Sequence, residues 1–158
     1  MCQPADLQAL FRGFHAAGGP LVGPVVLVST GSTPCWLSGG PQGVVLRDAG
    51  GEAVPANVRA ADQPAAGNPV ALVPGTTMPG FGAPPPHGSA WFLVTWTNWC
   101  ADTSPDVRSV QVALRGGGSV TAALDDSAPE WAVGPPTPRC DDAKAGSTLT
   151  IGRYLAPA

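Results

Sequence analysis

The strict alternation of side chains at positions 89–98, which read SAWFLVTWTN, is the clearest pattern along the chain. Successive side chains of a β-strand point to opposite faces, so this segment is predicted to be a strand with one face in the core. The predicted core face consists of Ala90, Phe92, Val94 and Trp96. Trp91 then lies on the other face, with Leu93, Thr95 and Thr97.

A second alternating segment, at positions 107–114, predicts another strand, with Val110, Val112 and Leu114 facing inward. The Arg-Gly-Gly-Gly sequence that follows is typical of a turn, and positions 119–124 are predicted to pair back as the second strand of a hairpin.

Other short apolar runs bounded by turn residues also predict strands, at positions 21–29, 35–37, 43–47, 54–58, 70–73 and 148–155. Positions 7–15 suit a first strand, although their spacing also suits a short helix. Pro24 removes a backbone donor from the run at 21–29, so that part is expected to be an edge or a bulge. The 54–58 strand is expected to return from a hairpin turn at 48–51.

About eight short strands separated by turns predict an all-β domain built as a two-sheet β-sandwich. No repeat and no change of composition divides the chain, so we expect a single domain over residues 1–158. Residues 74–88, rich in Pro and Gly, form the least regular segment.

Composition limits what this domain can do. Gly and Pro supply 21 and 19 of the 158 residues, which excludes long helices, while 44% hydrophobic and 12% charged residues argue against disorder. A net charge of −3 does not favour binding to nucleic acid, and no apolar run reaches the ~20 residues of a transmembrane segment.

Four cysteines allow three disulfide connectivities, of which we favour Cys2–Cys35 with Cys100–Cys140. Structural disulfides imply an oxidising compartment, so we expect an extracellular or cell-surface protein whose leader is absent from this sequence. An alternative reading makes Cys2 the lipid-modified cysteine of a lipoprotein, which leaves one thiol unpaired.

Several landmarks resemble a family of uncharacterised secreted and lipid-anchored proteins from high-GC bacteria, domain-of-unknown-function family 4232. They are the early Cys2, the segment STGSTPCWLSGGP at 29–41, LRDAGG at 46–51, LVPG at 72–75 and the Trp-bearing strand at 90–96. The later cysteines Cys100 and Cys140 also fall where the resemblance places a second bridge. The resemblance implies an immunoglobulin-like β-sandwich with two disulfides and implies no particular activity.

No convincing catalytic or metal-binding set is evident. His15 and His87 are the two histidines, and no nucleophile motif accompanies them. The pairs Asp125-Asp126 and Asp141-Asp142 lie in turn-rich sequence, where Asp bends the backbone. We therefore expect no catalytic residue, no cofactor and no metal. The alternative is a metal-dependent or carboxylate-based hydrolase of the cell envelope that uses Asp125, Asp126, Asp141 or His87.

Five Trp residues exceed what the core needs, because Trp36 and Trp96 suffice as core anchors. Trp91, Trp99 and Trp131 are then candidate binding residues, since exposed aromatic rings supply large contact areas. The competing interpretation is that Trp91 covers a sheet edge while Trp99 and Trp131 pack on the Cys100–Cys140 bridge.

Phe81 in the Pro- and Gly-rich segment is a further candidate, because an apolar residue on a long loop often serves recognition. We expect a secreted or surface-anchored, non-catalytic domain that binds a protein or a cell-envelope glycan through Trp91 and the Phe81 loop, with Trp99 and Trp131 as further candidates. A purely structural module is the remaining alternative.

Overall fold

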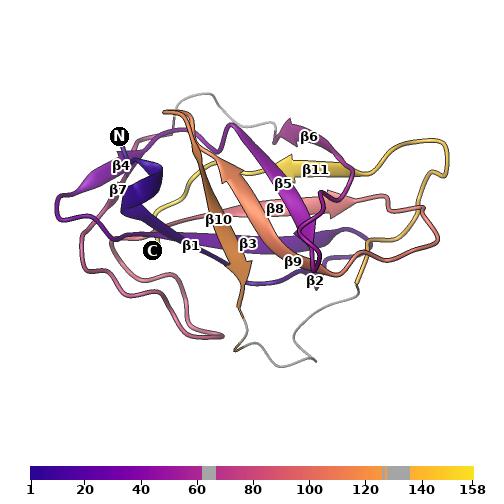
Figure 1. The fold of residues 1–158 in the computed structure, drawn as a ribbon, viewed down its shortest axis with the longest axis horizontal. Coiled ribbons are helices and arrows are strands. Elements are labelled where there is room, and N and C mark those ends of the chain that lie inside the picture. The colour runs from indigo at the N-terminus through magenta and orange to yellow at the C-terminus, as the bar shows by residue number, and fades with distance from the viewer. Residues whose placement is uncertain (62–66, 126, 128–135) are drawn as a thin grey trace.

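The computed structural model describes residues 1–61, 67–125, 127 and 136–158 of the chain (Figure 1). One short 3-10 helix, η1, precedes the strands in this part of the chain. The elements run in the order η1 (Pro4–Asp6), β1 (Leu7–Phe11), β2 (His15–Ala16), β3 (Leu21–Ser29), β4 (Cys35–Leu37), β5 (Gly43–Asp48), β6 (Asn57–Ala60), β7 (Val70–Leu72), β8 (Ala90–Thr97), β9 (Val107–Ala113), β10 (Ser119–Leu124) and β11 (Thr148–Ile151).

Nine strands form one sheet, and β4 and β7 form a separate two-stranded ribbon. The large sheet has the order β5-β9-β10-β1-β3-β8-β11-β6, with β2 also paired to β3. Two neighbouring pairs, β1 with β10 and β6 with β11, are parallel, and the other pairs are antiparallel.

The large sheet is nearly barrel-shaped. Strands β5, β9 and β10 cross over β3, β8 and β11 (Figure 1), and β6 and β11 at one end of the strand order contact β5 at the other. The all-β class and the presence of two sheets are confirmed. The structure differs from an immunoglobulin-like sandwich because one curled sheet, rather than two comparable layers, encloses the core.

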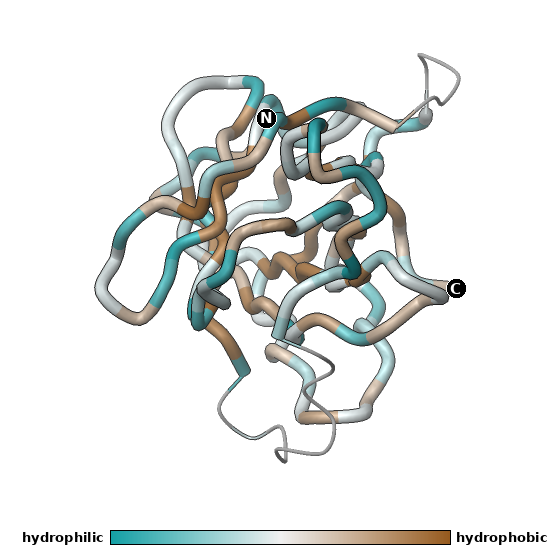
Figure 2. Tube along the Cα trace, turned by 90° about the vertical axis from the view of Figure 1, so that its right-hand side faces the viewer, coloured by the Kyte–Doolittle hydropathy of each residue, from teal (hydrophilic) through white to brown (hydrophobic). Residues whose placement is uncertain are grey.

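The core lies inside this curled sheet, where the apolar segments gather in Figure 2. The alternation predicted for β8 is confirmed, because its four predicted core residues are fully buried. The inward positions of β9 and the hairpin between β9 and β10 are also confirmed. The largest fully buried side chains include Trp96, Phe11, Phe92, Leu27, Leu46 and Leu149.

Pro24 shows how a proline is accommodated inside a sheet. The prediction of an edge is wrong, because β3 lies between β1 and β8, but the prediction of a bulge is confirmed. Val25 of β3 pairs with Phe11 of β1, and Val22 of β3 pairs with His15 of β2. Between these two pairs, the three residues 12–14 lie opposite the two residues 23 and 24. The Pro24 carbonyl accepts a hydrogen bond from Arg12 N at 2.9 Å. The missing N–H of Pro24 therefore faces this interruption and not β8.

Three segments differ from the sequence prediction. The strand predicted at 148–155 ends at Ile151, and Leu155 forms only an isolated bridge with Trp91. Positions 7–15 form β1 and the start of β2, separated by the bulge, rather than one strand or a helix. After the turn at 48–51, only residues 52–54 pair back onto β5. The chain then crosses to the other end of the sheet, where β6 pairs in parallel with β11.

Tyr154 offers a test of the core, because its hydroxyl is buried and has no hydrogen-bond partner among the described residues. Burial raises the pKa of Tyr154 well above its usual value of 10. An unpaired buried hydroxyl contributes no stability, so Tyr154→Phe is expected to leave the free energy of unfolding at pH 7 unchanged or to raise it by about 1 kcal/mol.

At alkaline pH the two proteins should diverge. Above pH ~10 the unfolded chain ionises Tyr154, while the folded chain keeps it protonated. The free energy of unfolding of the wild type therefore falls by up to about 1.4 kcal/mol per pH unit from this group, a loss that Tyr154→Phe does not have. Urea denaturation at pH 7 and pH 11 measures both effects. A variant less stable than the wild type by more than ~1 kcal/mol at pH 7 would show that the hydroxyl has a partner.

Candidate functional site

The candidate aromatic residues do not gather at one place in the structure. Trp91 lies near the start of β8, Trp99 follows the end of the same strand, and Phe81 lies in the loop between β7 and β8. Trp131 lies outside the described residues. Two separate surfaces, one at each end of β8, therefore carry the described candidates.

Trp91 lies on the outer face of the curled sheet, as the alternation of β8 predicts. Its cross-strand partner on β3 is Val26, whose own partner on β1 is Leu10. On the other side the Trp91 backbone exchanges two hydrogen bonds with Leu155, at 3.0 and 2.8 Å. Because β8 is an inner strand, the interpretation that Trp91 covers a sheet edge is wrong. Trp91 belongs to an apolar row on the outer face, together with Val26 and Leu10.

The Pro- and Gly-rich segment at 74–88 contains no strand and forms a long loop from β7 to β8 (Figure 1), and its residues 81–85 line a groove together with Pro24 and Val26 of β3. Val26 and Val28 belong to the outward-facing set of β3, yet only 1% and 2% of their surfaces are exposed. Arg12 Nη2 donates a hydrogen bond to the Gly80 carbonyl at 3.0 Å and so ties the loop to the sheet. The loop therefore lies beside Val26 and is tied to the sheet at Gly80.

Between the loop and the sheet runs a groove of about 380 Å³, which we call the loop groove. Pro24 and Val26 line it from the sheet and residues 81–85 line it from the loop. Arg12, Gly13 and His15 complete its wall. Phe81 is 40% exposed. The Phe81 loop thus lies next to Val26, the strand neighbour of Trp91, while Trp91 itself does not line the groove.

Asp125, a candidate of the hydrolase alternative, is buried at the end of β10. Its Oδ1 accepts hydrogen bonds from Ser127 N at 3.1 Å and Ser127 Oγ at 2.5 Å. Its Oδ2 lies 3.8 Å from Arg12 Nε, in an ion pair that is largely buried on both sides. This carboxylate therefore holds its own turn and orients Arg12, the residue that fastens the loop.

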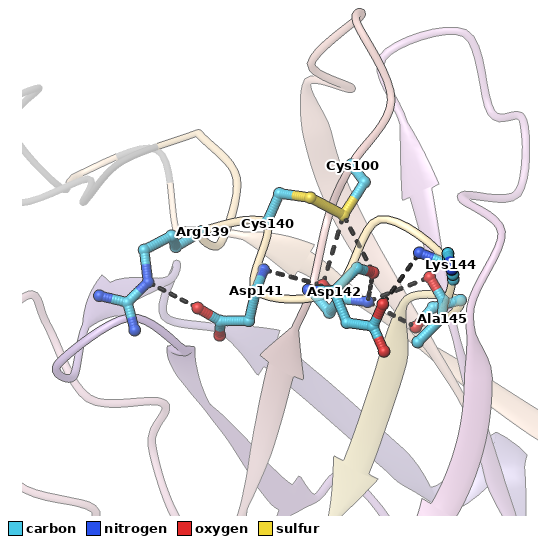
Figure 3. Close-up of a disulfide and its surroundings, with 9 residues drawn as sticks. Cys100, Arg139, Cys140, Asp141, Asp142, Lys144 and Ala145 are labelled. Atoms are coloured by element: carbon cyan, nitrogen blue, oxygen red, sulfur yellow. Dashed lines mark hydrogen bonds and ion pairs between the residues drawn. A yellow bond between two sulfur atoms is a disulfide. The ribbon is translucent and has the colours of Figure 1, made fainter.

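The other hydrolase candidates have separate surroundings. Asp141 accepts a hydrogen bond from Arg139 Nε at 2.7 Å directly after the second disulfide (Figure 3), His87 is exposed in the loop, and Asp126 lies outside the described residues. No group of three or more His, Cys, Asp or Glu side chains in the described part of the chain could hold a metal ion.

Trp99 packs edge-on against the buried Trp96, with ring centroids 5.4 Å apart and planes at 68°. Its indole Nε1 donates to the Thr103 carbonyl at 2.9 Å. Trp99 is half-buried and lines a second groove. Among the aromatic rings of the described residues, it contacts that of Trp96.

Trp36, predicted as a core anchor, is instead 49% exposed. It lies on β4 opposite Ala71 of β7, on the outer side of the ribbon, whereas Leu37 and Leu72 are buried. The alternation within Cys-Trp-Leu carries this signal: if Leu37 faces inward, Trp36 faces outward. The described chain therefore has an exposed Trp that sequence reasoning missed.

The disulfides Cys2–Cys35 and Cys100–Cys140 are both present, as favoured from the sequence. Cys2 is buried and its sulfur is bonded to Cys35, so the reading of Cys2 as a lipid-attachment residue is wrong for this structure. Among the described residues, no helix has both the length and the apolar character to span a bilayer.

Residues 2–79 match the model of a family described as Domain of unknown function (DUF4232). The match covers Cys2, Cys35 and the turn at 72–75, and it ends inside the loop at 74–88. The landmarks noted beyond it, the Trp-bearing strand and the second bridge, lie outside the match. No curated protein and no solved structure matches the chain.

Proposed function

We propose that this domain is a secreted or surface-attached, non-catalytic binding domain that recognises a protein partner through the loop groove and the neighbouring Trp91. The observation that carries the proposal is the position of the Phe81 loop. It is held against an apolar outer face by the Arg12–Gly80 hydrogen bond and leaves an open groove beside it.

The chemistry of the groove favours an apolar polypeptide segment. Phe81, Pro84 and Pro85 face Pro24 and Val26, so most of the wall offers contact area rather than hydrogen-bonding groups. Proline and a packed aromatic ring have few rotamers to lose, which lowers the entropic cost of binding. Grooves lined by aromatic residues are a recurring way to bind extended, proline-rich peptides.

Two disulfides support the extracellular part of the proposal, since such bonds persist in oxidising compartments. The resemblance to secreted proteins agrees with it. If the protein is lipid-anchored, the lipid is attached elsewhere than at Cys2, whose sulfur is already bonded.

Phe81→Ala and Trp91→Ala are each expected to lower affinity for the partner at least tenfold, because truncating a central aromatic residue of an interface costs about 1–2 kcal/mol or more. The test is affinity isolation of tagged protein from the solubilised cell envelope of the source organism, with bound proteins quantified. Trp36→Ala is the matched control, because Trp36 is exposed and does not line the groove.

The proposal requires bound proteins that the wild type and Trp36→Ala retain and that both groove variants lose, with thermal melts showing that all variants are folded. An unchanged set of bound proteins in Phe81→Ala and Trp91→Ala would overturn it. Envelope glycan, in place of protein, that the wild type retains and both groove variants lose would overturn the choice of partner.

A further inference from the structure

A second groove, of about 420 Å³, lies at the end of β8 remote from Trp91. We call it the Trp99 groove. One wall is the turn after β5 with the segment that follows, and the other is the loop between β8 and β9. The lining residues are Asp48, Ala49, Gly50, Ala53, Val54, Pro55, Trp99, Thr103, Ser104, Pro105 and Asp106. Its volume falls within the ~300–1,000 Å³ of ordinary small-ligand sites.

Trp99 is held in place before any ligand arrives. Its ring rests edge-on against the fully buried Trp96, and its Nε1 is hydrogen-bonded to the Thr103 carbonyl. The same hydrogen bond closes the loop that carries Trp99, Thr103 and Ser104, so all three residues are held on one wall of the groove. A rigid aromatic ring loses little conformational entropy when a ligand packs on it.

Asp48 places an acceptor on the wall of the groove. Its Oδ1 accepts hydrogen bonds from Gly50 N at 2.9 Å and Glu52 N at 3.0 Å, which set the turn. Its Oδ2 accepts no hydrogen bond from any residue in the described ranges.

Asp106 faces Asp48 in the same lining, but Arg108 neutralises it. Arg108 Nε and Nη2 both bond its Oδ2, at 2.9 and 2.8 Å. The Thr103 and Ser104 hydroxyls, both on exposed residues, add groups that can donate or accept. The groove thus combines one aromatic ring with acceptors of low net charge.

We propose that the Trp99 groove binds a neutral saccharide. A pyranose ring has an apolar C–H face, which packs on a flat aromatic ring, and a rim of hydroxyls, which donate to carboxylates and exchange hydrogen bonds with Ser and Thr. A cationic ligand fits less well, because Trp99 is the one aromatic residue in the lining and one of the two carboxylates is already paired. This site is separate from the loop groove and goes beyond the proposed function.

Binding is tested by isothermal titration and saturation-transfer NMR on the whole protein. The probes are chitotetraose, cellotetraose and maltotetraose, with choline as the cationic comparison. At least one saccharide is expected to bind with a Kd of about 1 mM or tighter, and Trp99→Ala and Asp48→Asn are expected to weaken it at least tenfold. Asp48→Asn keeps the Oδ1 acceptor that sets the turn.

Trp99→Phe is included because Trp99→Ala removes a ring packed on Trp96 and can destabilise the fold; the phenylalanine variant should bind with intermediate affinity. Phe81→Ala and Trp36→Ala are the matched controls and should bind as the wild type does. No saccharide binding up to about 10 mM, binding of choline alone, or binding that Asp48→Asn and Trp99→Phe leave unchanged would each overturn the proposal. Because the protein partner is tested with Phe81 and Trp91 variants, the two proposals can fail independently.

Discussion

Replacing Asn98 with alanine is expected to lower the free energy of unfolding by about 3 kcal/mol. Asn98 Nδ2 donates to the carbonyls of Asp142, Ala145 and Gly146 at 3.0, 3.1 and 3.2 Å. Its Oδ1 accepts from the backbone N–H groups of Asp141 and Asp142 at 3.0 and 2.9 Å. One side chain thus organises the whole turn that leads into β11.

The Asn98 backbone adds to this cost. Its φ of 61° lies in the left-handed region, which Asn tolerates and alanine does not. Asn98→Gly keeps the backbone conformation and loses only the side-chain bonds, so it should be about 1 kcal/mol more stable than Asn98→Ala. Asn98→Asp keeps the acceptor but places a carboxylate oxygen against the three carbonyl oxygens that Nδ2 contacts, so it should be at least as damaging as Asn98→Ala.

Urea denaturation of the three variants measures this order. If Asn98→Ala unfolds within about 0.5 kcal/mol of the wild type, the turn at 141–146 is held by other contacts.

Removing the disulfides should have the largest effect of all. The bridges join residues 33 and 40 positions apart, and the chain-entropy model gives about 4 kcal/mol for each loop of this size. Losing both therefore costs about 8 kcal/mol, which is comparable to the whole 5–15 kcal/mol stability of an ordinary domain.

The measurement is the urea midpoint of the wild type with and without reductant, beside Cys2→Ser/Cys35→Ser and Cys100→Ser/Cys140→Ser. Each double variant should lower the free energy of unfolding by about half as much as full reduction of the wild type does. A midpoint that reductant does not change would show that the bridges are dispensable and would remove a main support for an extracellular location.

Sequence reasoning succeeded where the signal was local. The alternation of β8 and β9 and the Gly-rich turn between β9 and β10 are written in neighbouring residues, because the two-residue period of a strand directly reports which face is buried. Both disulfides also pair cysteines that follow one another along the chain.

Sequence reasoning failed where an element is defined by its contacts with distant segments of the chain. The four residues of β6 are all exposed, so no buried face marks the strand, and its partner β11 lies some 90 positions later. The register that places Trp91 beside Val26, and the Arg12–Gly80 bond that ties the loop to the sheet, also join residues far apart in the chain. Composition could single out residues 74–88 but could not show what they cover.

The prediction that Trp36 anchors the core was wrong for a different reason. Counting five Trp residues against the needs of the core treats them as interchangeable, whereas exposure is decided by which side of a short strand each occupies. The two side chains take each other's expected positions: Trp99 packs against Trp96 at the core, and Trp36 is exposed.

The central claim is that the surface around Phe81 and Trp91 contacts another protein. Photo-crosslinking in the cells that produce the protein tests it most directly, with p-benzoylphenylalanine placed at position 81 and, as control, at the exposed position 36. A discrete protein adduct at 81 that is absent at 36 and lost when Trp91→Ala is combined with it is the result we predict. No adduct at 81, or the same adducts at both positions, would contradict the claim.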